Sequence, residues 1–152
     1  MNKDHLNVFC EDEHWQGVLS EKVPEGVFAE TLSYLKKNKL VPEVGFDKPI
    51  EISLSLSNNA EVQRLNASFR GMDKPTNVLS FANIDGEEFF EEIKQVDVVE
   101  LGDIIIALET LRDEAQQQGI SVQDHFSHLL VHGILHLFGY DHQTDEEADE
   151  ME

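Results

Sequence analysis

Three histidines near the end of the 152-residue sequence have the spacing for metal chemistry: His132, His136 and His142. Residues four apart on an α-helix differ by about 40° around its axis, so His132 and His136 share one face. Gly139 can adopt the positive φ that ends a helix and reverses the chain, which would bring His142 within reach as a third ligand. Three neutral imidazoles and an open fourth position are typical of catalytic zinc, which lowers the pKa of bound water toward about 7. We therefore expect one zinc ion per chain, and nickel is also compatible with these ligands.

The residue after the first histidine argues against one class of hydrolase. A lone histidine on an apolar helix is usually a core residue, but three at these spacings favour metal binding. The spacing resembles the zinc motif of metzincin proteases, in which a general-base glutamate follows the first histidine. Gly133 stands at that position here. Peptide hydrolysis would therefore lack a group that typically contributes about a hundredfold to ten-thousandfold to the rate.

Three further residues near this motif have open roles. His128 precedes His132 by one turn, and a fourth protein ligand would close the site, so a structural or substrate-facing role is favoured. Asp141 could orient a metal-bound histidine, accept a proton, or simply form the turn. Asp103, in an apolar run, could accept a hydrogen bond from such a histidine or cap a loop.

Arg70 is the side chain best suited to phosphate. Its guanidinium offers a planar fork of donors that matches phosphate oxygens, which makes it a candidate catalytic residue beside the metal-binding His132. The alternative is an ordinary arginine at a helix C-terminus, where the helix dipole favours a cation. Lys74, Thr76 and Asn77 offer further donors that could position backbone phosphates, or they form a solvated loop.

Composition limits the possible partners. Eleven Lys and Arg residues oppose thirty-one Asp and Glu residues, a net charge of -20, so general electrostatics cannot hold this protein on nucleic acid. Arg64, Arg70 and Lys74 form a local basic strip. This strip can still attract nucleic acid, since charges beyond about 8 Å are largely screened at physiological salt.

The single cysteine, Cys10, excludes an intrachain disulfide and a four-thiolate zinc site. With no long apolar run and no signal peptide, we expect a cytoplasmic protein without membrane association.

The patterns around these residues predict a single domain over residues 1–152, of α+β (mixed α/β) class. A small mixed β-sheet would be covered by helices, one of them a zincin-like histidine helix. Apolar and polar residues alternate strictly from Ile50 to Ser57, which indicates a half-buried strand. Capping residues and terminal glycines mark the helices. The acidic segment 84–99 receives no chemical role. Strands are expected at 6–10, 50–57, 77–81 and 101–107, and helices at about 24–38, 58–70, 108–118 and 122–138, with a short acidic helix after Thr144.

Three sequence blocks resemble one known family. They read FRGMDKPTNVLSF at 69–81, LGDI at 101–104 and HGILHLFGYDH at 132–142. In this order they resemble the YbeY family of bacterial metal-dependent endoribonucleases and rRNA maturation factors. The resemblance implies zinc ligands at His132, His136 and His142 and an activity-essential arginine at Arg70. It also implies cleavage of single-stranded RNA, maturation of the 3′ end of small-subunit (16S) rRNA, and a part in ribosome quality control.

Two other functions stay open at this point: a noncatalytic ribosome-assembly factor with structural zinc, and a different metal-dependent hydrolase. An acidic enzyme with one small basic strip should bind naked RNA weakly, so we expect the ribosome, ribosomal proteins or another partner to present the substrate. The sequence shows no aromatic series at stacking intervals and so predicts no base preference.

Overall fold

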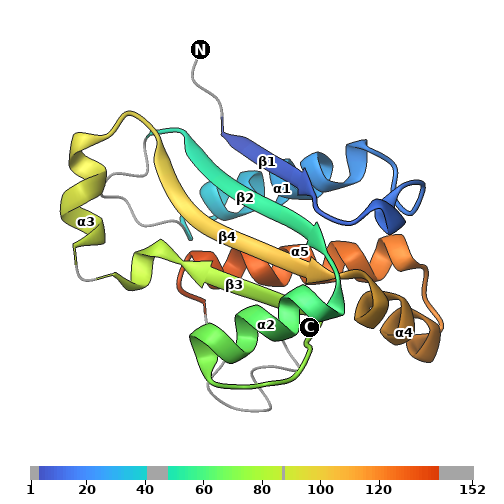
Figure 1. Ribbon diagram of the computed structural model, residues 1–152. Helices are drawn as coiled ribbons and strands as arrows, with labels where there is room; N and C mark the ends of the chain where they lie inside the picture. The colour runs from blue at the N-terminus through green and yellow to red at the C-terminus, as the bar shows by residue number, and fades with distance from the viewer. Residues whose placement is uncertain (1–3, 41–47, 87, 141–152) are drawn as a thin grey trace.

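The computed structural model describes residues 4–40, 48–86 and 88–140, and in this part four strands and five helices form a mixed α+β fold (Figure 1). The predicted fold class is therefore confirmed. The acidic helix expected after Thr144 lies outside the described residues. In chain order the elements are β1 (His5–Cys10), α1 (Lys22–Lys37), β2 (Ile50–Ser57), α2 (Asn59–Arg70), β3 (Val78–Ala82), α3 (Phe89–Glu92), β4 (Val99–Ala107), α4 (Leu108–Gln118) and α5 (Val122–Leu137).

The four strands form one sheet in the order β1-β2-β4-β3. β1 runs parallel to β2 and β2 parallel to β4, whereas β3 is antiparallel to β4 and forms one edge of the sheet. The alternation in β2 has the predicted effect, because Ile52 and Leu54 are fully buried while Ser53 and Ser55 on the other face are only partly covered.

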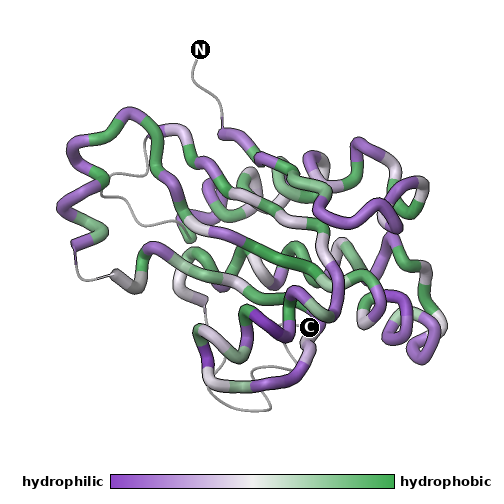
Figure 2. The backbone as a smooth tube through the Cα atoms, in the orientation of Figure 1, coloured by the Kyte–Doolittle hydropathy of each residue, from purple (hydrophilic) through white to green (hydrophobic). Residues whose placement is uncertain are grey.

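Helices cover the two faces of the sheet unequally. α1 and α5 pack on one face, and α2 crosses the other face near β3 (Figure 1). The main core lies under α1 and α5, where Ile104 and Ile106 of β4 meet Phe126 and Ile134 of α5. A smaller cluster under α2 contains Val62, Leu79, Ile105 and Ala107. Figure 2 shows the apolar colouring along β4, with polar colouring prominent on α4.

A glycine in β4 permits close contact between this strand, β3 and α5. The pairing of β2 with β4 shifts register between Glu51 and Ile52, opposite Glu100 and Gly102. Gly102 has a φ of 151°, and a Cβ there would lie 2.2 Å from the carbonyl oxygen of Phe81 and 2.8 Å from Cδ2 of Leu137. Only a residue without a side chain fits between the edge strand and the end of α5.

The two helices that carry the candidate residues begin and end where the local signals indicate. Asn58 accepts a hydrogen bond from the Glu61 amide at 2.9 Å at the start of α2, and Ser121 accepts one from the Asp124 amide at 3.0 Å at the start of α5. Gly71 follows α2 with a φ of 69°. Among the described helices, none has the length and apolar character needed to cross a membrane.

Candidate functional site

One flank of α5 carries four histidines: His125, His128, His132 and His136. Their spacings of three, four and four residues keep all four within about 80° around the helix axis. His125 is buried, His128 is exposed, and His132 and His136 are half-buried. α5 is continuous through the last two, so they share one face as their spacing predicts. Of the two roles expected for His128, structural or substrate-facing, its exposed side chain is compatible with the second.

The turn after α5 also matches expectation. Gly139 has a φ of 93°, its amide donates to the carbonyl of His136 at 2.9 Å, and the Tyr140 amide donates to the carbonyl of Leu135 at 3.0 Å. This pair of hydrogen bonds is a Schellman motif, which ends the helix and reverses the chain. His142 and Asp141 lie outside the described residues.

The two described histidines suit a zinc site in their chemistry. Imidazole nitrogen is a preferred zinc ligand, and partial burial limits competition from water. Within residues 4–40, 48–86 and 88–140, no three His, Cys, Asp or Glu side chains gather into a metal-binding group. The third ligand would have to come from His142, and metal binding by His132, His136 and His142 stays a prediction.

Gly133 has a steric role that its sequence position did not reveal. A Cβ on this residue would lie 3.1 Å from Cδ1 and Cγ2 of Ile104 and 3.2 Å from Oγ of Ser80. Position 133 therefore faces the sheet, at the point where α5 lies against β3 and β4. A glutamate there would begin in tight contact with the Ile104 and Ser80 side chains, which would have to shift by a few tenths of an ångström, so the position of the zincin base is a packing position on this fold.

Arg70 extends from the C-terminal end of α2 toward the edge strand. Its Nη2 atom donates to the carbonyl oxygen of Ser80 at 3.0 Å, and its guanidinium lies 5.9 Å from the centre of the Phe81 ring. Ser80 is also the residue whose Oγ lies against Gly133. Although α2 and α5 cover opposite faces of the sheet, both reach the edge strand β3 at Ser80. The structure therefore brings Arg70 to the strand on which the histidine helix packs.

The loop between α2 and β3 is fixed at both ends. Asn66, buried in α2, donates through Nδ2 to the carbonyl of Lys74 at 3.0 Å. Asn77 donates to Oε1 of Glu114 at 3.0 Å, and its own carbonyl accepts from the Ala107 amide at 3.0 Å. The side-chain amide of Asn77 thus donates to Glu114. The sequence had suggested instead that Asn77 could donate to a phosphate of the RNA backbone. Lys74 is exposed and Thr76 is half-buried.

His125 and Glu114 are two residues that the sequence did not single out. Nε2 of His125 lies 2.8 Å from Oε1 of Glu114, which links the start of α5 to α4 and, through Asn77, to the loop before β3. Nδ1 of His125 is buried and has no hydrogen-bond partner among the described residues. The sequence signal that could have identified His125 is its position seven residues before His132, which places both residues on the same flank of α5.

Asp103 lies on the other side of the sheet from the histidines. It pairs with Phe81 in the β3–β4 ladder, and its neighbour Ile104 is the residue that faces α5. Desolvation by the surrounding protein raises the pKa of the Asp103 carboxyl above its ordinary value. This position does not let Asp103 orient a histidine of α5.

Comparison with known proteins places these features in a family. A family model described as Endoribonuclease YbeY matches residues 11–152. The chain is 53% identical over 106 residues to Endoribonuclease YbeY of Paramagnetospirillum magneticum, covering 70% of this chain and 63% of that protein. The corresponding protein of Rhodospirillum rubrum is 55% identical over 104 residues, which cover 68% of this chain and 51% of that protein. The chain thus spans between half and two-thirds of the length of these two relatives.

Two further comparisons extend over nearly the whole chain. Endoribonuclease YbeY of Rhizobium etli is 44% identical over 149 residues, covering 97% of this chain and 82% of that protein. The solution structure of TM1509 from Thermotoga maritima aligns with a TM-score of 0.54 at 24% identity, over 97% of this chain and 84% of that one, and supports the fold. On the family match and these identities, the chain belongs to the YbeY family.

Proposed function

We propose that this protein is a metal-dependent endoribonuclease that cleaves single-stranded RNA. The relatives at 44–55% identity carry the name endoribonuclease. The observation that carries the proposal is the convergence of Arg70 and the histidine helix on β3. Arg70, which can hold a phosphate, and α5, the helix whose two histidines can hold a metal, contact the same residue of β3. Both groups suit phosphodiester hydrolysis, because each can stabilise negative charge on the phosphate oxygens.

The metal would be zinc, held by His132, His136 and His142. When bound, zinc supplies positive charge for polarising a phosphoryl oxygen and acidifying water. The residues of the chain position the substrate around it. A guanidinium has five N–H donors, and Arg70 uses one on Ser80, which leaves the others for phosphate oxygens. The bond to Ser80 also fixes the orientation of the fork before substrate arrives, which reduces the entropy lost on binding.

The substrate we propose is the precursor of small-subunit rRNA, with maturation of the 16S 3′ end and ribosome quality control as the cellular role. The proposal rests on the sequence blocks shared with the family. The net charge of -20 opposes tight binding to free RNA, so the ribosomal particle or a ribosomal protein would deliver the RNA strand to the enzyme in the cytoplasm.

The test combines zinc quantification with cleavage of single-stranded and duplex RNA. Arg70→Ala should keep its zinc and lose about a hundredfold to a thousandfold in cleavage rate, the range for removing one charge-stabilising donor. His132→Ala should lose both zinc and cleavage. Arg112→Ala is the matched control, since Arg112 is an exposed arginine of α4 that lies outside the basic strip; it should cleave normally.

Two outcomes would contradict the proposal. Arg70→Ala with a full zinc content and the wild-type cleavage rate would remove the role of this arginine. Normal rRNA processing in cells by a folded His132→Ala variant without nuclease activity would favour a noncatalytic assembly factor.

A further inference from the structure

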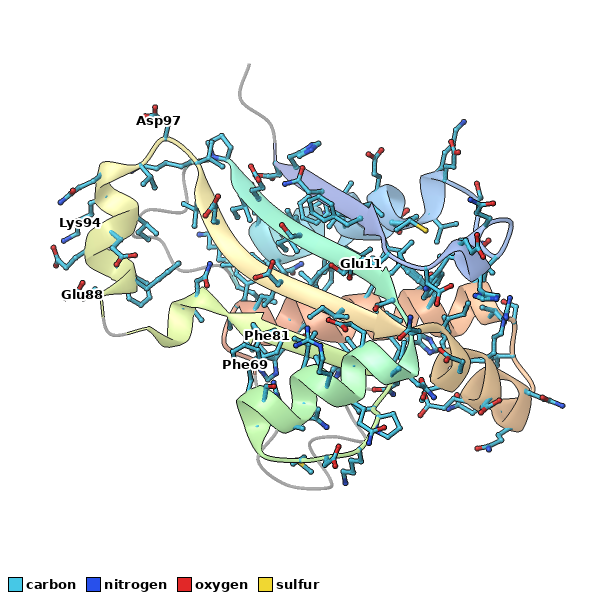
Figure 3. All side chains as sticks on the ribbon, in the orientation of Figure 1. Glu11, Phe69, Phe81, Glu88, Lys94 and Asp97 are labelled. Carbon is cyan, nitrogen blue, oxygen red and sulfur yellow. The ribbon has the colours of Figure 1, made fainter. Side chains whose placement is uncertain are left out.

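Phe69 is the most exposed large apolar side chain of the described chain, at 70%. It lies on α2 next to Arg70, and its ring packs against the Phe81 ring of β3 with centroids 5.5 Å apart and planes at 67°. Figure 3 shows the two labelled rings together on the face of the molecule that α2 crosses. Phe69 therefore has a fixed neighbour on one side and solvent around most of its ring.

The position of this pair relative to Arg70 is well defined. Phe81 is half-buried and lies in the β3–β4 ladder, so its ring is a rigid support. The Arg70 guanidinium stands over the Phe81 ring at 5.9 Å and also donates to the backbone of Ser80, the residue before it. A ring that faces solvent, a supporting ring and a cation thus form one group, which we call the Phe69 platform: Phe69, Phe81 and Arg70.

We propose that the Phe69 platform stacks one unpaired nucleobase of the RNA strand beside the phosphate that Arg70 holds. This inference rests on the proposed function and adds a binding subsite to it. Aromatic side chains next to a backbone-binding cation are the general means by which proteins hold single-stranded nucleic acid. Both faces of a base inside a duplex are covered by its neighbours, so the subsite would favour single strands. Stacking does not read base edges, so the subsite would tolerate all four bases.

The same chain contains a second phenylalanine pair that serves as a control. Phe90 on α3 is 42% exposed and packs against Phe89 with centroids 5.2 Å apart at 83°. Its neighbours in the sequence are acidic, including Glu88 and Glu91, and Figure 3 shows Glu88 at the α3 end of the molecule. Negative charge repels a phosphate backbone, so this pair has the rings but not the cation.

The experiment measures binding of a fluorescein-labelled single-stranded 2′-O-methyl RNA oligonucleotide to the zinc-loaded full chain by anisotropy at low salt. Loss of one base–aromatic stack should raise Kd by about 5- to 150-fold in Phe69→Leu. Phe69→Trp should bind at least as well as the wild type, and Phe90→Leu should match the wild type. Thermal denaturation of each variant checks that the fold is intact.

A set of oligonucleotides with one abasic position each locates the stacked base. At one position, removing the base should weaken wild-type binding as much as Phe69→Leu does, and should not weaken Phe69→Leu further. Losses that add at every position would overturn the inference, as would equal Kd values for Phe69→Leu and Phe90→Leu. A Phe69→Leu variant that lost affinity for a ribosomal protein but not for RNA would also overturn it.

Failure of the proposed function would be visible separately. Methylation removes the 2′-hydroxyl nucleophile, and gel analysis of the probe after each titration checks that zinc-activated water has not cleaved it, so the anisotropy reports on binding and not on cleavage. If the wild type bound this probe through Phe69 but cleaved no unmodified single-stranded RNA, the stacking subsite would stand and the nuclease assignment would fall.

Discussion

Gly102→Ala should destabilise the protein more than an added methyl group at any other described glycine. The new Cβ would lie 2.2 Å from the carbonyl oxygen of Phe81 and 2.8 Å from Cδ2 of Leu137. The first atom belongs to the backbone of an edge strand and the second to the packed end of α5. The carbonyl oxygen cannot move away without shifting the strand, whereas the Leu137 side chain would have to take another position in the core.

Two terms set the magnitude. Gly102 has a φ of 151°, and a side chain held in such a conformation costs about 1–3 kcal/mol. Forcing a methyl group into a packed interface costs about 1–3 kcal/mol more. The free energy of unfolding should therefore fall by about 2–6 kcal/mol, which is a large share of the total for a domain of this size. The melting temperature should fall by about 5–20 °C.

Gly119→Ala separates these two terms. Gly119 also has a positive φ, 69°, but a Cβ there would meet nothing within 4 Å. Urea unfolding of both variants should show that Gly102→Ala loses about 1–3 kcal/mol more than Gly119→Ala, which is the steric term alone. Equal losses in the two variants would show that β3 and α5 do not lie against Gly102 as closely as described.

Three further predictions concern polar side chains. Glu114→Ala should lower the free energy of unfolding by about 1–3 kcal/mol in urea titrations, because it leaves buried His125 without its carboxylate; a neutral result would contradict the link between α4 and α5. Asp103→Asn should raise the melting temperature at neutral pH, because its raised pKa means that the fold disfavours the charged form; the gain should vanish in acid, where the wild-type carboxyl is protonated. The pKa of Asp12 is lowered from 3.8 to about 2, first by the His14 amide and then by Asn58. Its contribution is complete above about pH 4 and lost as the pH falls to about 2, so Asp12→Asn should flatten the stability profile in that window, and an unchanged profile would refute this.

The elements with local signals were predictable from the sequence. The strict alternation at 50–57 gives β2 with the expected bounds, and the Asn58 cap with Gly71 gives α2. α5 follows from Ser121 and Gly139 in the same way. Each of these signals acts over a few residues, so no tertiary contact is needed to interpret it. By contrast, β4 begins at Val99, two residues before the apolar run, and the four-residue helix α3 is too short for a periodic pattern.

The candidate site was only partly predictable, for a physical reason. The shared face of His132 and His136 follows from helix geometry within one element. The contacts of Arg70 with Ser80 and of Phe69 with Phe81 join a helix to a strand across a loop, and no spacing rule specifies them. The sequence therefore showed no aromatic series, although the fold assembles an aromatic pair.

Gly133 connects the packing of the fold to the chemistry proposed for it. In a zincin protease the corresponding position carries the general base, whereas here it is the point of contact between α5 and the sheet. That contact lets α5 lie against Ser80, the residue whose carbonyl holds Arg70. The histidine helix and the guanidinium of Arg70 therefore meet at one residue of β3, and position 133 carries no carboxylate there. A cation attracts the negative charge of a phosphodiester, whereas a carboxylate at the same place would repel the phosphodiester. Both features fit the proposed phosphodiesterase better than a protease.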